Sequence, residues 1–213
     1  MSSGEKYKKE RKEVARFMRR LYDRGLTTTS GGNISLRVSD DIILITPSAT
    51  DKGRMKWKEV GIMTIMGENL TPWLKPSIES EMHLSAYRKK KNAKAIIHAH
   101  PVFASAFTAI RFPIDTTLTA EATAILGTPV MVPYALMGST GLASIVADNI
   151  TRSEILLLEN HGVLTIGKDL LQSFDRIEVL ENAARMTVIA EITRKKSPLT
   201  RNRVIEIEKL FKL

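Results

Sequence analysis

The sequence predicts a layered α/β or α+β domain in which helices cover a central β-sheet. Short apolar and β-branched segments, bounded by Gly, Asp or Pro as strands usually are, intermix with longer segments of helical periodicity. With 43% hydrophobic and 26% charged residues, the 213-residue chain has the composition of a folded protein with a sizeable core. Because no internal repeat or low-complexity segment interrupts it, we expect one domain over residues 1–213, with a helical tail from about residue 195.

The predicted elements follow one another along the chain. An amphipathic helix is predicted from Glu5 to Arg24, because apolar residues recur there at helical spacing and Gly25 stands where a helix end often needs left-handed geometry. Strands are predicted at residues 34–38, 41–46, 61–70, 95–100, 154–162 and 163–167. Further helices are predicted from about Ser77 to Lys91, after Pro101, and from Asp169 to about Arg194.

The formal net charge of +9 raises the possibility of nucleic-acid binding. The cations cluster at residues 6–20, 87–91 and 193–196, but glutamates are interleaved in the first cluster and no aromatic stacking pattern accompanies them. We interpret these clusters as solvated helix faces and expect no nucleic-acid partner. A basic nucleic-acid-binding domain is the non-enzyme alternative, and it predicts salt-dependent affinity for DNA or RNA and no metal.

Hydropathy and cysteine content indicate where the protein is located and which metal ligands it can offer. No apolar run approaches the roughly 18 to 20 residues of a membrane span, and the N-terminus lacks the apolar segment of a secretory signal. We therefore expect a cytoplasmic protein without a membrane partner. The absence of cysteine excludes disulfides and thiolate ligands, so a site for a soft metal must be built from histidine and carboxylate.

Two of the four histidines, His98 and His100, stand two residues apart at the end of the apolar run "AIIHAH". Residues i and i+2 of a strand project from the same face, about 7 Å apart at Cα, so both imidazoles can converge on one ion. The alternative is a pair of packed or hydrogen-bonded histidines. His161 follows the apolar run "ILLL" in a turn marked by Asn160 and Gly162, and it is the candidate third ligand. Three imidazoles leave an open coordination position, as in catalytic zinc sites.

The fourth histidine, His83, lies four residues after Glu79 in "ESEMH", so the two can share a helix face. A single histidine of this kind is usually a packed or capping residue, and we expect a structural role for His83. Glu79 has three possible roles near a bound cation: a ligand, a general base or a surface charge.

Several motifs together resemble the class II aldolase/adducin-type family, which includes the zinc-dependent fuculose-phosphate aldolases and the ribulose-phosphate 4-epimerases. The resemblance covers the chain from the first helix to about Arg194. It rests on the motifs "TTTSGGNISLRV", "LITPSATD", "KPSIESEMHLSAYRKKKNAKAIIHAHP", "VPYALMGS" and "LLLENHGVLTIG". The family fold that it implies is an α/β/α layered domain with a central, mainly antiparallel β-sheet. It also implies a homotetramer with active sites at subunit interfaces.

The resemblance implies a role for each candidate site residue. His98, His100 and His161 would hold zinc, or another divalent transition metal. Glu79 would coordinate the metal before substrate binds and then move protons.

A phosphate pocket is expected on physical grounds and by the same resemblance. The "TSGGN" turn can present backbone amides and the Asn33 side chain to an anion, Ser48 is a further donor, and Ser77 is expected at a helix N-terminus. The chain departs from the family pattern at two positions. Ile78 replaces a serine, leaving only its backbone amide to donate, and Ala49 replaces a glycine.

The predicted activity is metal-assisted cleavage of a ketose 1-phosphate, such as fuculose 1-phosphate, to dihydroxyacetone phosphate and an aldehyde, and the reverse reaction. The tyrosine that approaches the aldehyde in some fuculose-phosphate aldolases aligns near Thr117 here, which leaves the aldehyde open. Two enzyme alternatives remain. A methylthioribulose-1-phosphate dehydratase would use the same metal chemistry, whereas a sugar-phosphate 4-epimerase resembles this chain with Asp in place of Glu79.

Overall fold

The computed structural model describes residues 5–211, and a single mixed sheet forms its centre. The seven strands lie in the order β3-β2-β1-β4-β7-β6-β5, and all neighbours are antiparallel except β5 and β6. Their bounds are β1 Asn33–Arg37, β2 Ile42–Ile45, β3 Gly61–Thr64, β4 Ala95–Ala99, β5 Val130–Val132, β6 Ile155–Leu158 and β7 Gly162–Gly167.

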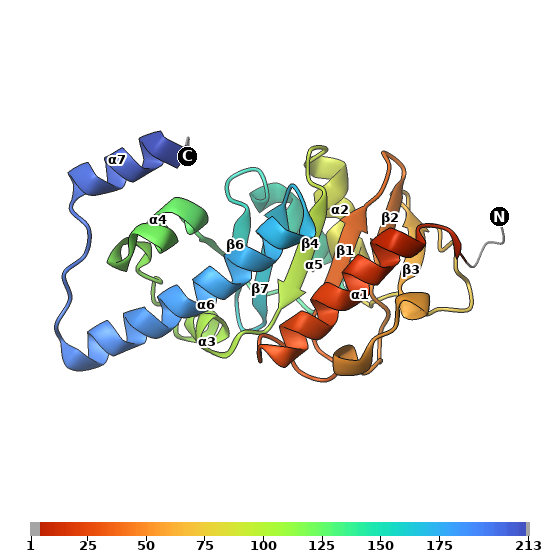
Figure 1. The fold of residues 1–213 in the computed structure, drawn as a ribbon, viewed down its shortest axis with the longest axis horizontal. Coiled ribbons are helices and arrows are strands. Elements are labelled where there is room, and N and C mark those ends of the chain that lie inside the picture. Colours follow the sequence, from red (N-terminus) through yellow and green to blue (C-terminus); the bar gives the residue numbers. More distant parts are fainter. Residues whose placement is uncertain (1–4, 212–213) are drawn as a thin grey trace.

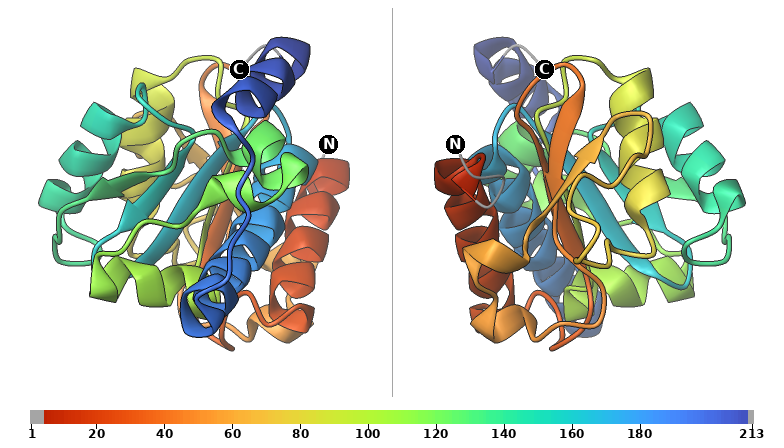
Figure 2. Two further views of the ribbon diagram at one scale, coloured as in Figure 1. Left: turned by 90° about the vertical axis from the view of Figure 1, so that its left-hand side faces the viewer. Right: turned by 90° about the vertical axis from the view of Figure 1, so that its right-hand side faces the viewer.

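Helices cover both faces of this sheet (Figures 1 and 2), which confirms the predicted layered α/β/α fold class. The helices are α1 Lys8–Asp23, α2 Ser80–Lys89, α3 Val102–Ile110, α4 Ala120–Leu126, α5 Thr140–Asn149, α6 Leu170–Thr193 and α7 Arg201–Phe211. Single turns of 3₁₀-helix occur at Lys52–Arg54, Trp57–Glu59 and Thr116–Leu118. Helices α1, α3, α4 and α6 share one hydrophobic cluster with the sheet, and α2 and α5 share the other.

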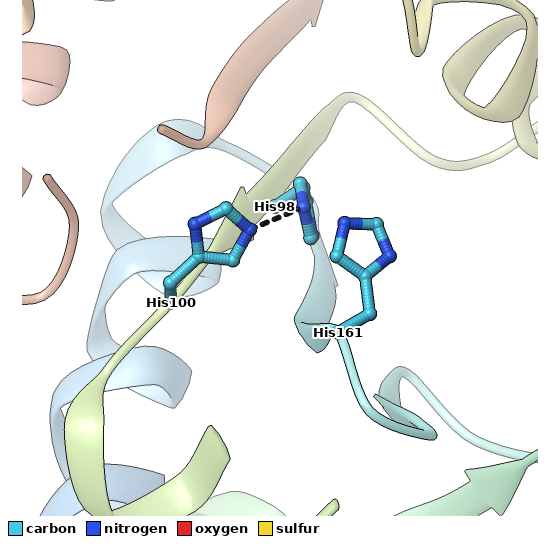
Figure 3. Close-up of side chains that lie close together, drawn as sticks. All are labelled: His98, His100 and His161. Carbon is cyan, nitrogen blue, oxygen red and sulfur yellow. Dashed lines mark hydrogen bonds between the residues drawn. The ribbon is translucent and has the colours of Figure 1, made fainter. Parts of the chain in front are cut away.

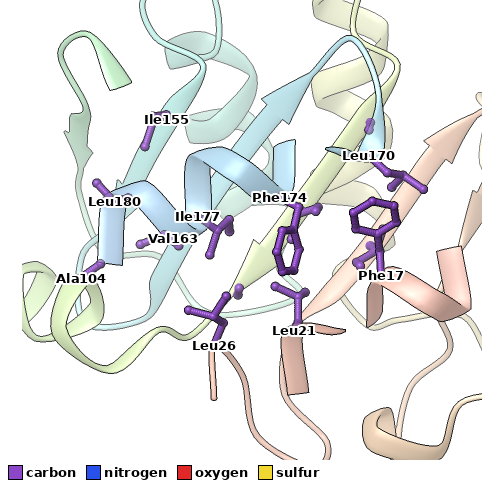
Figure 4. Close-up of a cluster of buried hydrophobic side chains, with 14 of the residues drawn as sticks. Phe17, Leu21, Leu26, Ala104, Ile155, Val163, Leu170, Phe174, Ile177 and Leu180 are labelled. Carbon is purple, nitrogen blue, oxygen red and sulfur yellow. The ribbon is translucent and has the colours of Figure 1, made fainter. Parts of the chain in front are cut away.

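The larger core cluster fixes the central strands against α1 and α6. Phe17 of α1 and Phe174 of α6 pack edge to face, with ring centroids 5.6 Å apart (Figure 4). Burying one such side chain stabilises the fold by about 1.5–3 kcal/mol. Because α6 also packs along β4 and β7, these two strands have little freedom to move relative to each other. They are the strands next to which the predicted histidine ligands lie.

Several predicted elements are shorter in the structure. The strand expected at residues 61–70 ends at Thr64, because the chain turns through Gly67 (φ 98°) and returns to pair Asn69 with Met63. The strands expected at 154–162 and 163–167 form a hairpin whose turn spans residues 159–161. Asn160 adopts φ 54° in that turn, a left-handed conformation that asparagine tolerates. Helix α2 begins at Ser80 rather than near Ser77.

Four elements between residues 111 and 153 were not predicted: the 3₁₀ turn at Thr116–Leu118, α4, β5 and α5. Strand β5 is only three residues long and stands between Pro129 and Pro133, so it carries almost no periodic signal. After α6, an extended segment turns back and α7 returns beside α4 (Figure 1). The amide of Leu199 donates to the carbonyl of Thr117 at 2.8 Å, which attaches this segment to the body of the protein.

The interpretation of the basic clusters as solvated faces is wrong at Arg11. This side chain is 2% exposed, and its guanidinium donates to the carbonyls of Val60 and Lys58, each at 3.0 Å. Part of the first cluster therefore joins α1 to the loop before β3. Within residues 5–211, no helix is long and apolar enough to cross a membrane.

Candidate metal centre

Three imidazoles converge at one end of the sheet (Figure 3). His98 lies on β4, His100 follows the end of that strand, and His161 lies in the turn between β6 and β7. Because β4 pairs with β7, the turn that carries His161 is held next to the end of β4. The nearest ring nitrogens of the three side chains all lie within 4.8 Å of one another.

The hydrogen bonds of His98 determine which of its nitrogens faces the other two rings. Its Nδ1 lies 2.9 Å from the carbonyl of Val163, which can only accept, so Nδ1 donates. Burial and the neighbouring His100 and His161 hold the pKa of His98 well below its ordinary value, so the ring is neutral and Nε2 carries a lone pair. His98 is thus in the tautomer that a metal requires.

The lone pair of His98 Nε2 points toward His100. The two Nε2 atoms are 2.9 Å apart, and burial lowers the pKa of His100 to about 4, with His161 contributing. The Nε2 atoms of two neutral imidazoles can lie this close only if one ring donates a hydrogen to the other or if both lone pairs bind a cation. The close approach of the two neutral rings is therefore compatible with a shared cation.

Two glycines make room for His100. A Cβ on Gly31 would stand 2.8 Å from His100 Nδ1, and a Cβ on Gly162 would stand 2.5 Å from His100 Cδ2. Any larger residue at either position would displace the ring, so the "SGGN" and "NHG" motifs both shape the histidine cluster. This packing was not predicted, because the contacts join segments far apart in the chain.

Glu79 lies against the cluster at the start of α2. Its Oε1 is 3.2 Å from His161 Nε2, and its Oε2 is 3.4 Å from His98 Nε2. The side chain is almost fully buried, and Oε1 has no hydrogen-bond partner within residues 5–211. A buried carboxylate with an imidazole nitrogen beside each of its oxygens is strongly unfavourable unless a proton or a metal ion joins them.

These observations fit a divalent metal. His98, His100 and His161 offer three nitrogens, and Glu79 offers the adjacent carboxylate oxygen. Three histidines with a fourth, exchangeable position are the donor set of a catalytic site. The structure thus brings together all four residues that the sequence predicted for the metal centre.

Asn33 lies beside the centre, although its contacts differ from the predicted ones. It is the β1 residue paired with His98 of β4. Its Nδ2 donates to Glu79 Oε2 at 2.8 Å, and its Oδ1 lies 2.5 Å from His83 Nε2. Asn33 therefore holds the carboxylate, and only one amide hydrogen remains for a ligand. His83 is fully buried and bonded at both ring nitrogens, as expected for a packed residue.

The remaining predicted phosphate ligands lie on two adjacent turns, joined by a bridge between Pro47 and Pro76. The amide of Ile78 donates to Ser48 Oγ at 3.0 Å, so the two groups bind each other and the hydroxyl hydrogen of Ser48 is left to donate. Ser77 lies in the turn before α2, where its Oγ accepts from the Glu79 amide at 3.2 Å. Ala49 is exposed and has φ 51°, a conformation that favours glycine.

Comparison with known proteins identifies the class. Residues 12–188 match the family model described as Class II Aldolase and Adducin N-terminal domain. The chain therefore belongs to the class II aldolase and adducin family, as its motifs indicated, and it is an enzyme of the carbon–carbon lyase type.

Two curated relatives differ in their stated activities. The chain is 33% identical to the L-fuculose phosphate aldolase of Methanocaldococcus jannaschii over 186 residues, which cover 87% of this chain and 99% of the relative. It is 32% identical to the 3-oxo-tetronate 4-phosphate decarboxylase of Haemophilus influenzae over 173 residues, with 79% and 81% covered.

Solved structures show the same fold. The structure of YgbL from Escherichia coli superposes with a TM-score of 0.87 at 27% identity, covering 94% of this chain and 98% of that one. An L-fuculose 1-phosphate aldolase superposes with a TM-score of 0.86 at 28% identity, covering 95% and 96%.

Proposed function

We propose that this protein is a divalent-metal-dependent aldolase that cleaves a ketose 1-phosphate, such as fuculose 1-phosphate, to dihydroxyacetone phosphate and an aldehyde, and catalyses the reverse reaction. Zinc is the proposed metal. The observation that carries the proposal is the position of Glu79, whose carboxylate lies 3.2 Å from His161 and 3.4 Å from His98. An acid/base group adjacent to a three-histidine metal site is what this reaction requires.

Each group has a distinct role in the proposed reaction. A divalent metal held by His98, His100 and His161 would supply Lewis-acid stabilisation of negative charge on the substrate oxygens next to the breaking carbon–carbon bond. As that bond breaks, the hydroxyl on the departing carbon gives up its proton to the solvent and becomes the aldehyde oxygen. The electron pair stays on the three-carbon phosphate, and Glu79 delivers the proton that converts this carbon into the CH₂OH group of dihydroxyacetone phosphate.

Phosphate binding is assigned to the two turns and to the end of β1. The free hydroxyl hydrogen of Ser48 and the remaining amide hydrogen of Asn33 support this role, together with Ser77. The backbone at Ala49 and Ile78 would complete the pocket. Holding the phosphate keeps the reacting carbon in place next to Glu79.

Decarboxylation of a 3-oxo acid phosphate is a second candidate, favoured by the 32%-identical decarboxylase. Loss of CO₂ also leaves an electron pair on carbon beside a polarised oxygen, but it needs no group near a departing aldehyde. Thr117, which aligns near the tyrosine of some fuculose-phosphate aldolases, directs its hydroxyl to Asp115 Oδ1 at 2.6 Å. Thr117 has no phenol to offer to an aldehyde. This agrees either with an aldolase that releases a different aldehyde or with a decarboxylase, which releases no aldehyde.

A substrate panel tests these candidates. It contains the 1-phosphates of fuculose, rhamnulose, ribulose, 5-deoxyribulose and methylthioribulose, together with 3-oxo-tetronate 4-phosphate, and products are identified by mass. Dihydroxyacetone phosphate with an aldehyde supports the aldolase, and CO₂ supports the decarboxylase. Loss of water without carbon–carbon cleavage would indicate the dehydratase, and an isomer of unchanged mass would indicate the 4-epimerase. Turnover of none of these compounds would refute the proposed function.

Three properties implied by the family resemblance are proposed alongside the reaction: zinc as the metal, a homotetramer with active sites at subunit interfaces, and a cytoplasmic location. Metal analysis of the purified protein checks the first, with about one zinc per chain expected. Mass measurement in solution checks the second, and fractionation of the source cells checks the third.

A further inference from the structure

A continuous series of hydrogen bonds runs from Glu79 into the space between β1 and α2. Glu79 Oε2 lies 2.8 Å from Asn33 Nδ2, and Asn33 Oδ1 lies 2.5 Å from His83 Nε2. His83 Nδ1 lies 2.6 Å from Ser35 Oγ, which lies 2.9 Å from the hydroxyl of Tyr87. All five residues are buried, so these groups depend on one another for hydrogen bonds.

The direction of each bond follows from the orientation of the Asn33 amide. Its Nδ2 donates to the Glu79 carboxylate, so its Oδ1 faces His83 and can only accept. His83 Nε2 must therefore donate. Burial lowers the pKa of His83 to about 3, so the ring is neutral and carries a single hydrogen. With that hydrogen on Nε2, Nδ1 is an acceptor.

The same reasoning extends to the inner end. Because Nδ1 of His83 is an acceptor, the single hydrogen of Ser35 Oγ lies toward it at 2.6 Å rather than toward the more distant Tyr87 hydroxyl at 2.9 Å, and the Tyr87 hydroxyl donates to the carbonyl of Lys94 at 3.4 Å. Burial raises the pKa of Tyr87, so its hydroxyl keeps its hydrogen. Every donor from Ser35 through His83 to Asn33 thus points toward Glu79. Bonds aligned in one direction polarise and strengthen one another.

We propose that His83 is a positioning residue, which through Asn33 fixes Glu79 Oε2 as a hydrogen-bond acceptor and leaves Oε1 to exchange the substrate proton. This inference rests on the proposed function, because it assigns the working oxygen of the acid/base group. Both oxygens face a candidate metal ligand, Oε1 at 3.2 Å from His161 Nε2 and Oε2 at 3.4 Å from His98 Nε2, but only Oε1 has no hydrogen-bond partner within the described part of the chain. In the proton-abstracting direction, Oε1 takes the hydrogen of a substrate C–H bond, whose electron pair stays on carbon; the reverse step returns it.

The first experiment determines the tautomer of His83 directly. The metal-loaded protein is labelled with ¹⁵N-histidine, and its four histidine rings are examined by long-range ¹H–¹⁵N correlation spectra, with His83→Gln used to assign the signal. We expect the hydrogen of His83 on Nε2. A hydrogen on Nδ1 would reverse the series of bonds and overturn the proposal. This result depends neither on turnover nor on the choice of substrate, so it stands apart from the fate of the proposed function.

The second experiment compares two substitutions of His83 in an assay where the wild type turns over. His83→Gln keeps an amide that can donate to Asn33, whereas His83→Phe keeps a ring without nitrogen. Loss of a hydrogen-bond partner that orients a group beside a metal typically costs about 10- to 100-fold, so we expect kcat of the Phe variant to fall by that factor, with KM and metal content within about twofold of wild type. The Gln variant is expected to recover most of the activity.

A merely structural role would not give this pattern. If the Gln variant is as slow as the Phe variant, or if the Phe variant keeps the wild-type kcat, the positioning role is refuted. Tyr87→Phe provides a third variant, since it removes only the hydroxyl that lies beside Ser35 and leaves the bonds from Ser35 to Glu79 in place. We expect Tyr87→Phe to lower kcat less than His83→Phe does. A larger loss would contradict the proposed order of residues along the series of hydrogen bonds. If the Phe variant does not fold, the tautomer of His83 measured in the wild-type protein decides whether the proposal stands.

Discussion

The two halves of the proposed site are built differently. The histidine half lies at the ends of paired strands, and its residues are held by bonds from the interior: His98 by Val163, and Glu79 by Asn33. The phosphate half lies on two turns, where Ser48 and the amide of Ile78 bind each other and Ile78 is 56% exposed. The chemical groups are therefore rigid, and the recognition groups sit on segments that tolerate change.

This difference explains where the chain departs from its family. Both departures in the proposed phosphate pocket, Ala49 and Ile78, are exposed residues in turns. The residues proposed to hold the metal and move the proton, His98, His100, His161 and Glu79, lie within the motifs that resemble the family. A substitution in the turns costs at most one ligand contact, whereas one in the histidine cluster disturbs several buried groups at once. The predictions below test this contrast, in order of decreasing effect.

The largest loss is expected from removing a histidine ligand. His98→Ala and His161→Ala each leave two imidazoles, too few to retain a divalent metal, so both metal content and turnover should be abolished. Metal is measured on the purified protein by elemental mass spectrometry. His83→Gln serves as the control, because it changes a histidine outside the cluster and should keep its metal. Unchanged metal content in either alanine variant would remove that residue from the ligand set.

A loss of about 10²- to 10⁴-fold in turnover is expected for Glu79→Gln, the usual cost of removing a positioned acid/base group. Metal should remain, since the three histidines are untouched. Exchange of solvent deuterium into dihydroxyacetone phosphate isolates the proton-transfer step, because it requires no aldehyde. The rate of this exchange should fall by a similar factor. Exchange at the wild-type rate would show that another residue moves the proton.

Acidification should destabilise the metal-free protein through its buried histidines. Burial lowers the pKa of His83 to about 3 and that of His100 to about 4, and it also lowers the pKa of His98, from an ordinary value of 6.5. Between about pH 6.5 and 4 the unfolded chain binds protons that the folded chain does not, so the free energy of unfolding falls as pH falls. The loss should reach a few kcal/mol over this window.

Urea unfolding at a series of pH values, with chelator present, measures this slope. His83→Gln removes one buried histidine outside the metal cluster and should flatten part of it. Equal slopes in the variant and the wild type would mean that His83 does not remain neutral in the folded state.

Much of this organisation was predictable from local pattern. The placement of His98 and His100 follows from the two-residue period of a strand, and His161 from the turn residues around it. The helix face shared by Glu79 and His83 follows from their spacing. These predictions need only residues that are neighbours in sequence.

The remaining features depend on contacts between distant segments. Asn33 lies beside His98 because β1 pairs with β4 in one register, and Gly31 and Gly162 matter because both approach His100. Arg11 is buried by a loop about 50 residues away along the chain, as its bonds to Val60 and Lys58 show. The residue pattern within one helix or strand contains no information on contacts with distant segments. The bonds of His83 to Asn33 and the burial of Arg11 could therefore not be predicted.

A smaller effect on activity is expected from a substitution in the turns of the proposed phosphate site. Ser48→Ala removes a hydroxyl that is free to donate to phosphate, and a hydrogen bond to a charged group contributes about 1.5 kcal/mol, so KM should rise about tenfold with kcat unchanged. Ser39→Ala, in the exposed turn between β1 and β2, is the control and should leave both constants unchanged. A fall in kcat without a change in KM would place Ser48 in the chemical step instead.

The smallest effect, and the only gain, is expected for Ala49→Gly. Ala49 has φ 51°, a left-handed conformation that costs an L-residue about 1–2 kcal/mol, while glycine adopts it freely but loses more entropy on folding. The net change should stabilise the protein by about 0.5–1 kcal/mol and raise Tm by a few degrees. Ala190→Gly, within α6, is the matched control. There glycine has only the entropic disadvantage, so Tm should fall. If both substitutions lower Tm, the turn at Ala49 is not strained, and the contrast between a rigid histidine half and an adaptable phosphate half loses its energetic support.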